Sequence, residues 1–200
     1  MGNSKRVDHQ NNAVILYTSQ NTTVIDKLKT TKRYVAKSEF IQEKYGEVAP
    51  VFLQAYAWYR HKAANIVSLP KDAESAIWTF TDSRYLNNHE DSMIMELYVP
   101  MDKIVFFRMS DWNKILNLQC LGNELEVQQY KDKLKKFNIT YEGEVFNTSF
   151  YPLLKRELLI SWEKLFQYDE WIKRTKELPF NDMQGGLWEI QASWIRSFID

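Results

Sequence analysis

The chain has 200 residues with 26 basic and 26 acidic side chains, so its formal charge is zero. This length suits one domain that buries a core without disulfides or metal ions, and the single Cys120 excludes a disulfide framework and a zinc cluster. The absence of a basic surplus argues against a nucleic-acid partner, and no apolar run approaches the roughly 20 residues of a membrane span. We therefore predict a cytoplasmic protein without a membrane partner.

The predicted elements begin after a polar leader. Residues 1–12 lack the apolar segment of a signal peptide, and we expect a disordered leader before a single domain at 13–200. The run AVILYTS at 13–19 is β-branched and aromatic, which predicts a strand. NTTVIDKLKTT follows, with Asn21 or Thr22 as a helix cap. The first strand therefore leads directly into a helix.

The middle of the chain predicts one long helix and three strands. Apolar side chains at helical spacing form a continuous stripe from 46 to about 66. The segment 75–82 alternates aromatic residues with threonines, as a strand does. The runs MIMELYV (93–99) and KIVFF (103–107) predict two strands joined by a tight corner at Pro100.

The last part of the chain predicts three helices and a closing strand. Apolar spacing places the helices at 110–117, 123–138 and 151–171, and GLWEIQ at 186–191 is the closing strand. Several strands are consecutive or hairpin-like, whereas a doubly wound parallel sheet alternates strands with helices. We therefore predict a compact α+β fold with a mixed or antiparallel sheet and several amphipathic helices.

No familiar catalytic motif occurs in the sequence. It lacks a phosphate-binding glycine loop and a nucleophile elbow, and its three His residues lack metal-ligand spacing, so no metal site is predicted. Polar residues at strand ends remain, where rigid scaffolds present functional groups. They are Tyr17, Thr18, Gln20, Thr79, Thr81, Asp82, Gln184 and Glu189. A purely structural role also fits them, because Thr is common in strands and Glu189 can point outward by simple alternation.

Six segments together resemble a known family. They are ILYTSQ, LQAYAWY, IWTF, MELYVPMDKIVFFRMSDWNKILN, SWEKLF and QGGLWEIQ, and their order and spacing carry the likeness. The family is bacterial and uncharacterised, and is catalogued as domain of unknown function three-eight-four-one. The resemblance covers most of residues 13–192. It implies relatives and leaves the function open.

The order of strands and helices also resembles mono-ADP-ribosyltransferases. In that family a first-strand Arg or His contacts NAD, a second strand shapes the nicotinamide pocket, and a late Glu stabilises the positive charge that develops on the ribose. The resemblance places Tyr17 or Thr18 on the first strand, Thr79 to Thr81 on the second, and Gln184 or Glu189 at the acidic position. The chain departs from the pattern, because its first strand has no Arg or His and Glu-x-Glu is missing.

Two functions are therefore open. The first is an ADP-ribosyltransferase-like, NAD-binding domain with an atypical or degenerate site, in which catalysis itself is undecided. Its candidate catalytic residues are Glu189 and Gln184, and its candidate cofactor-binding residues, expected to share a cleft, are Tyr17, Thr18, Gln20, Trp78, Thr79 and Thr81. The second is a non-catalytic binding or interaction module with an exposed aromatic surface around Trp58, Tyr59 and Trp78, since the chain has seven Trp and no complete catalytic constellation. The partner, a small molecule or a protein, stays open.

Overall fold

An antiparallel sheet organises the fold. The computed structural model describes residues 6–37, 49–87, 90–146 and 148–199. Within these residues the sheet has seven strands in the order β6 (Ile104–Arg108), β7 (Met183–Leu187), β4 (Ile77–Phe80), β2 (Ala13–Asn21), β5 (Ser92–Pro100) and β9 (Ile195–Ile199), and β1 (Val7–Asp8) pairs with β2. A second, two-stranded sheet joins β3 (Arg33–Tyr34) to β8 (Ile190–Gln191). The described pairings are antiparallel, and the predicted α+β class is confirmed.

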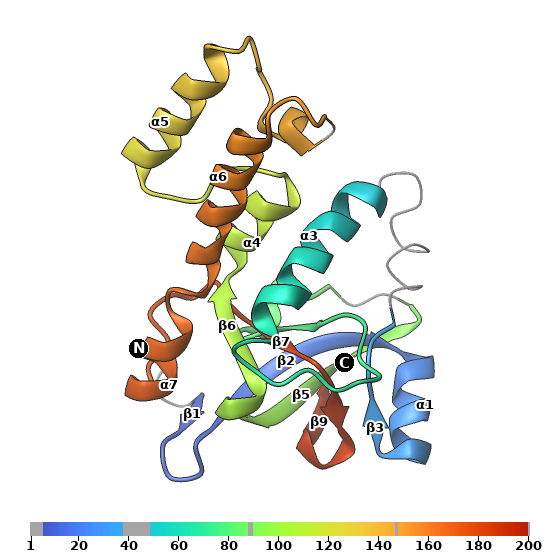
Figure 1. Cartoon of the computed structure of the whole chain (residues 1–200). Coiled ribbons are helices and arrows are strands. Elements are labelled where there is room, and N and C mark those ends of the chain that lie inside the picture. Colours follow the sequence, from blue (N-terminus) through green and yellow to red (C-terminus); the bar gives the residue numbers. More distant parts are fainter. Residues whose placement is uncertain (1–5, 38–48, 88–89, 147, 200) are drawn as a thin grey trace.

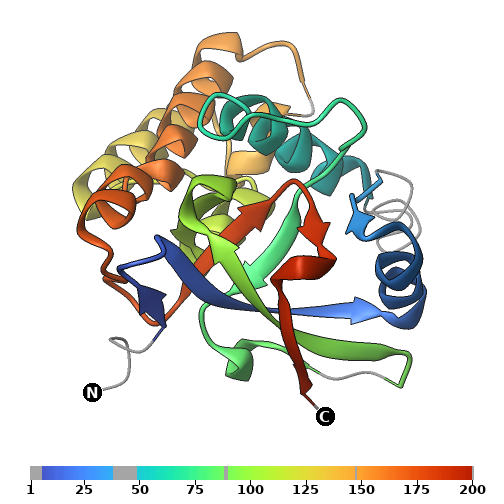
Figure 2. The ribbon, with the colours of Figure 1, turned by 90° about the horizontal axis from the view of Figure 1, so that it is seen from below.

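Helices surround this sheet unevenly. Figure 1 shows α3 (Ala49–Ala63), α4 (Met109–Leu116), α5 (Glu124–Lys135) and α6 (Pro152–Trp162) gathered on one side of the strands. Helix α1 (Thr22–Thr31) lies beside β3, and α7 (Asp169–Thr175) lies towards β1. Seen from below, the strands come to the front (Figure 2). Short 3-10 turns connect the elements: η3 (Ser83–Tyr85), η4 (Met101–Lys103), η5 (Glu142–Phe146), η6 (Glu163–Phe166) and η7 (Ala192–Trp194).

Helix starts agree with local capping chemistry. The side chain of Asn21 accepts a hydrogen bond from the Thr23 backbone N–H at 2.9 Å, so α1 begins where β2 ends. Asn123 and Glu126 form a capping box at the start of α5. Of the helix predicted from residue 46, the structure describes the part from 49 onward, as α3.

The predicted corner is confirmed, since β5 ends at Pro100 and the short η4 leads into β6. The two strands are not neighbours in the sheet, because β2, β4 and β7 lie between them. Two boundaries differ from the sequence-based prediction. The predicted helix 151–171 is broken into α6, η6 and α7. The predicted closing strand 186–191 belongs to two different sheets, since the chain bends at Trp188 between β7 and β8.

The expected leader overlaps the described part of the chain. Val7 and Asp8 form β1 and pair with Val14 and Ala13 of β2. The Asp8 carboxylate accepts backbone N–H groups from the next turn and the Tyr98 hydroxyl at 2.6 Å. Residues 1–5 lie outside the described residues.

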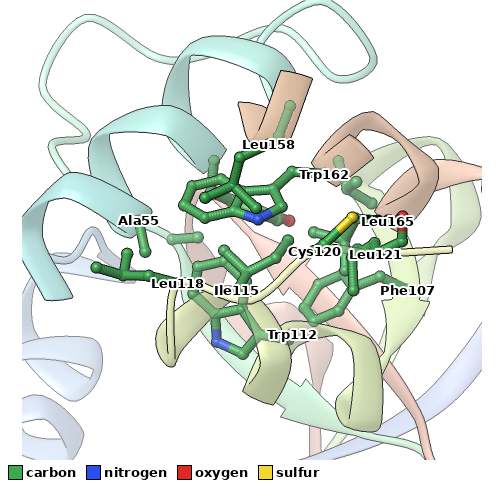
Figure 3. Close-up of a cluster of buried hydrophobic side chains, with 14 of the residues drawn as sticks. Ala55, Phe107, Trp112, Ile115, Leu118, Cys120, Leu121, Leu158, Trp162 and Leu165 are labelled. Atoms are coloured by element: carbon green, nitrogen blue, oxygen red, sulfur yellow. Dashed lines mark hydrogen bonds between the residues drawn. The ribbon is translucent and has the colours of Figure 1, made fainter. Parts of the chain in front are cut away.

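Two hydrophobic cores cover the two faces of the sheet. One holds Leu16, Met95, Leu97, Ile104 and Phe106 with the apolar side of α1. The other is rich in aromatic residues and packs β4 and β6 against α3, α4 and α6. Figure 3 shows part of this second core, in which the side chains include Phe107, Trp112, Leu158, Trp162 and Leu165.

The aromatic residues around Trp58 belong to this second core. Tyr59 is only 1% exposed, and Trp58 and Trp78 are partly buried against the same cluster. These three residues therefore contribute to packing and do not form the exposed aromatic patch expected for an interaction module. The strongly exposed large apolar side chains lie elsewhere, with Phe150 83% and Leu153 76% exposed.

Candidate ligand pocket between strands β2 and β4

Strands β2 and β4 separate after a single residue pair. Tyr17 lies opposite Phe80 in the register of these two strands. By contrast, β2 pairs along its whole length with β5, and β4 pairs along its whole length with β7. Next to this separation the surface holds a pocket of about 490 Å³, lined by both strands. That volume lies within the range typical of small-molecule sites, about 300–1,000 Å³.

The pocket has aromatic walls and neutral polar groups. Its lining residues come from β2, from β3 and the chain after it, from α3, from β4 with its preceding residues, from the segment around η3, and from the start of β5. They are Thr18, Ser19, Gln20, Tyr34, Ala36, Lys37, Tyr56, Ser75, Ala76, Ile77, Trp78, Phe80, Tyr85, Leu86, Asn87 and Ser92. Among these described residues Lys37 is the sole cation, and no carboxylate lines the pocket. The Lys37 ammonium donates to the Glu74 carboxylate at 2.8 Å and to the Asp72 carbonyl at 2.9 Å.

Hydrogen bonds link the polar side chains of the pocket to its strands. The Thr18 hydroxyl, almost fully buried, donates to the Trp78 carbonyl at 3.0 Å and so bridges the two separating strands. The Gln20 Nε2 donates to the Thr18 hydroxyl at 2.8 Å. On the aromatic side, the Trp78 indole N–H donates to the Tyr56 hydroxyl at 3.1 Å. Both walls are thereby held in fixed orientations before a ligand arrives.

An ion-pair network supports one wall of the pocket. Arg33 Nε donates to the Glu189 carboxylate at 2.5 Å, and the two terminal nitrogens of Arg33 donate to the Asp72 carboxylate at 2.6 and 3.0 Å. These bonds lower the pKa of Asp72, because Arg33 stabilises its charged form. Arg33 directly precedes Tyr34, which lines the pocket. The network therefore ties the β3–β8 pair to the loop that carries Asp72.

The comparisons with known proteins establish the family. The family model described as domain of unknown function (DUF3841) matches residues 15–196, which is most of the chain. The chain belongs to the DUF3841 family. No curated protein and no solved structure matches it. The match spans the pocket and the helices over the second core, so both are part of the DUF3841 domain.

Within the DUF3841 domain, the pocket unites part of the predicted residue set. Thr18, Gln20 and Trp78 line it together. Tyr17 does not line it, and its hydroxyl donates to the Glu96 carboxylate at 3.2 Å across the β2–β5 pair. Burial, and then the nearby Glu96 carboxylate, raise the pKa of Tyr17.

Of the predicted threonines, Thr79 lies on β4 and Thr81 directly follows this strand, and both are buried. Thr79 and Thr81 have no exposed surface, and their hydroxyls donate to the carbonyls of Gly185 at 2.8 Å and Met183 at 3.0 Å. Because neighbouring strand residues point to opposite faces, Thr79 faces away from Trp78. These two threonines strengthen the pairing of β4 with β7 and do not reach the pocket.

The predicted acidic position is also outside the pocket. Gln184 is 4% exposed on β7, opposite Phe80 and Phe107, and its side-chain oxygen has no hydrogen-bond partner among the described residues. Glu189 lies in the bend between β7 and β8, where it accepts from Arg33 and, at 2.7 Å, from Gln191. Neither side chain lines the pocket.

Sequence reasoning missed several lining residues. Tyr34, Tyr56 and Tyr85 come from three separate segments, and no local pattern marks them as neighbours. Tyr56 was visible only as a member of an apolar helix stripe. The described residues contain no group of three or more His, Cys, Asp or Glu that could hold a metal ion. Nor does the described part of the chain contain a helix that is long and apolar enough to cross a membrane.

Proposed function

We propose that this chain is a ligand-binding domain whose pocket between β2 and β4 binds a planar ring of an NAD-type molecule without catalysis by Glu189. One observation carries the proposal. Thr18, Gln20 and Trp78, three of the residues that the NAD-binding hypothesis names as candidates for cofactor binding, line one pocket of about 490 Å³. We thus propose that the chain shares NAD binding with the transferases, whereas the residues that would perform their reaction are degenerate.

The aromatic walls support a ring-shaped ligand. Tyr56 and Trp78 meet edge to face with ring centroids 5.5 Å apart, and Phe80 and Tyr85 stack at 6.3 Å. Stacking of a base on an aromatic side chain contributes about 1–3 kcal/mol. Neutral hydrogen-bonding groups such as Thr18 and Gln20 then orient the ring, as in most small-molecule sites.

The distribution of carboxylates argues against transferase chemistry. Breaking the glycosidic bond of NAD places positive charge on the ribose, which a fixed carboxylate must stabilise in the transition state. Within the described residues no carboxylate lines the pocket, and Glu189 is bound by Arg33 at 2.5 Å. The described part of the pocket can therefore bind the ligand and holds no carboxylate that would help to cleave it.

NAD titration followed by tryptophan fluorescence tests the proposal, because Trp78 lies in the pocket wall. We expect saturable quenching in the wild type and about tenfold weaker binding in Gln20→Ala, which loses a hydrogen bond to the ligand. In Glu189→Gln, whose amide oxygen can still accept from Arg33, we expect saturable NAD binding to remain and nicotinamide release to be absent, as in the wild type. Gln129→Ala, at an exposed position on α5, is the matched control.

Two results would contradict the proposal. One is a flat response up to millimolar NAD, which would favour an interaction module that uses exposed side chains such as Phe150. The other is nicotinamide release by the wild type that Glu189→Gln abolishes, which would restore an enzymatic role for this carboxylate.

A further inference from the structure

We infer that Gln20 recognises the amino edge of an adenine ring, so that the pocket selects the uncharged adenosine part of its ligand. The inference rests on the proposed ligand pocket and adds the ligand class and the residue that determines specificity. It follows from the chain of hydrogen bonds that joins Trp78, Thr18 and Gln20.

This chain of hydrogen bonds has a fixed direction. The Trp78 carbonyl can only accept, so the Thr18 hydroxyl at 3.0 Å must donate its single proton to it. Towards Gln20 the hydroxyl can then only accept. The Gln20 atom that lies 2.8 Å from this hydroxyl must therefore be the amide nitrogen, and the flipped amide would place two acceptors against each other.

The hydrogen-bonding groups of the Gln20 amide that do not contact Thr18 match one kind of partner. Within the described residues its amide oxygen and its second N–H have no other hydrogen-bond partner, and Gln20 lines the pocket, so both groups can face a ligand. Adenine offers an amino N–H donor beside the N7 acceptor, and glutamine binds this edge through two hydrogen bonds. Hypoxanthine carries a carbonyl oxygen in place of the amino group, so its oxygen would face the Gln20 oxygen.

The charges around the pocket favour the nucleoside over its phosphates. Among the described lining residues Lys37 is the only cation, and Glu74 and the Asp72 carbonyl already accept from its ammonium. Strong phosphate sites use several charged or backbone donors aimed at the phosphate oxygens. A diphosphate would therefore gain little here, and affinity should depend mainly on the ring and the ribose.

Isothermal titration calorimetry with adenosine, inosine, nicotinamide and NAD tests the inference on the full chain. We expect adenosine to bind about tenfold more tightly than inosine, because a side chain that binds a base through two hydrogen bonds discriminates against the wrong base by about this factor. NAD should bind within a few-fold of adenosine and change little between low and high salt. Nicotinamide alone should bind weakly or not at all.

Two variants test the role assigned to Gln20. Gln20→Met keeps the length of the side chain and should abolish the preference for adenosine over inosine. Thr18→Val removes the hydroxyl that fixes the amide, so we expect the same loss of preference with binding of the ring retained. Thr30→Val, on the exposed side of α1, is the control and should keep the preference.

The outcomes separate this inference from the proposed function. Equal affinity for adenosine and inosine, or tight nicotinamide binding without adenosine binding, would overturn the inference while the pocket stands as a ligand site. A much higher affinity for NAD than for adenosine that disappears at high salt would assign recognition to the phosphates. This result would also overturn the inference. No binding of any of the four compounds would overturn the proposed function together with the inference.

Discussion

At the scale of single residues, the adjacent glycines of β7 are needed for packing on both faces of the sheet. A Cβ at Gly185 would lie 2.8 Å from both Ile104 Cγ2 and Thr79 Oγ1. A Cβ at Gly186 would lie 2.0 Å from the Tyr59 hydroxyl oxygen. The Gln-Gly-Gly run near the end of the chain is therefore part of a core strand, and its glycines make room for the side chains above and below it.

We expect Gly186→Ala to lower the free energy of unfolding by about 3 kcal/mol, because overpacking a rigid core forces neighbouring groups to move. Urea denaturation followed by tryptophan fluorescence measures the change. Tyr59→Phe should restore part of the loss in the double variant by removing the hydroxyl. The restoration is incomplete, since the ring carbon Cζ would still lie 2.9 Å from the new methyl group.

Tyr59→Phe alone is the control for this pair. The Tyr59 hydroxyl is buried and has no hydrogen-bond partner among the described residues, so its removal should leave stability unchanged or slightly higher. A Gly186→Ala protein as stable as wild type, or a double variant that loses the sum of both single effects, would contradict this account of the glycine.

At the scale of elements, a buried carboxylate joins η5 to the loop after α4. Glu142 is 7% exposed and accepts the Cys120 backbone N–H at 2.5 Å. The same loop is held to α6, because the Trp162 indole N–H donates to the Gln119 carbonyl at 2.8 Å. Figure 3 shows Trp162 and Cys120 in this region of the core. Burial raises the pKa of Glu142, and the hydrogen bond from Cys120 and the charge of Lys131 offset only part of the rise.

This raised pKa predicts how stability changes with pH. Folded Glu142 holds its proton at a higher pH than the unfolded residue, whose pKa is about 4.3. The stabilisation that folded Glu142 gains by holding this proton is therefore fully present below about pH 4. It is lost as pH rises through the pKa of the folded residue. Glu142→Gln keeps an acceptor for the Cys120 N–H without the charge. It should match wild type at about pH 4 and be more stable than wild type at neutral pH.

Urea unfolding of both proteins across this pH range checks the prediction. Glu144→Gln, at an exposed position of η5, controls for the loss of one negative charge. A constant difference between wild type and Glu142→Gln at all pH values would show that the carboxyl group keeps its ordinary pKa in the fold.

Local elements were predictable from the sequence, and strand partners were not. The caps at Asn21 and Asn123 depend on residues within one turn, so the starts of α1 and α5 follow from composition. The position of β7 between β4 and β6 depends on pairing between distant segments. Glu189 was misplaced on the last strand because the chain bends at Trp188, whose indole N–H donates to the Val67 carbonyl at 2.9 Å in the core.

At the scale of the whole molecule, the pocket is a consequence of the way the sheet divides. β2 continues beside β5 and β4 continues beside β7, so the chain leaves room where these two pairs separate. The sequence was sufficient to place Thr18, Gln20 and Trp78 on strands. That they line one pocket depends on where β2 and β4 separate, which the sequence does not show. The Arg33–Glu189 pair and the bond from Thr18 to Trp78 then hold the two walls in place.

Hydrogen–deuterium exchange with and without saturating NAD tests whether the pocket between β2 and β4 binds the ligand, because it locates the bound ligand on the chain. We predict slower exchange in peptides that cover residues 18–20, 34–37 and 75–80, because most of the residues in these segments line the pocket. Peptides from α5 should exchange equally in both states. Protection confined to α5 and α6, or exchange that NAD leaves unchanged throughout, would contradict the assignment of this pocket as the functional site.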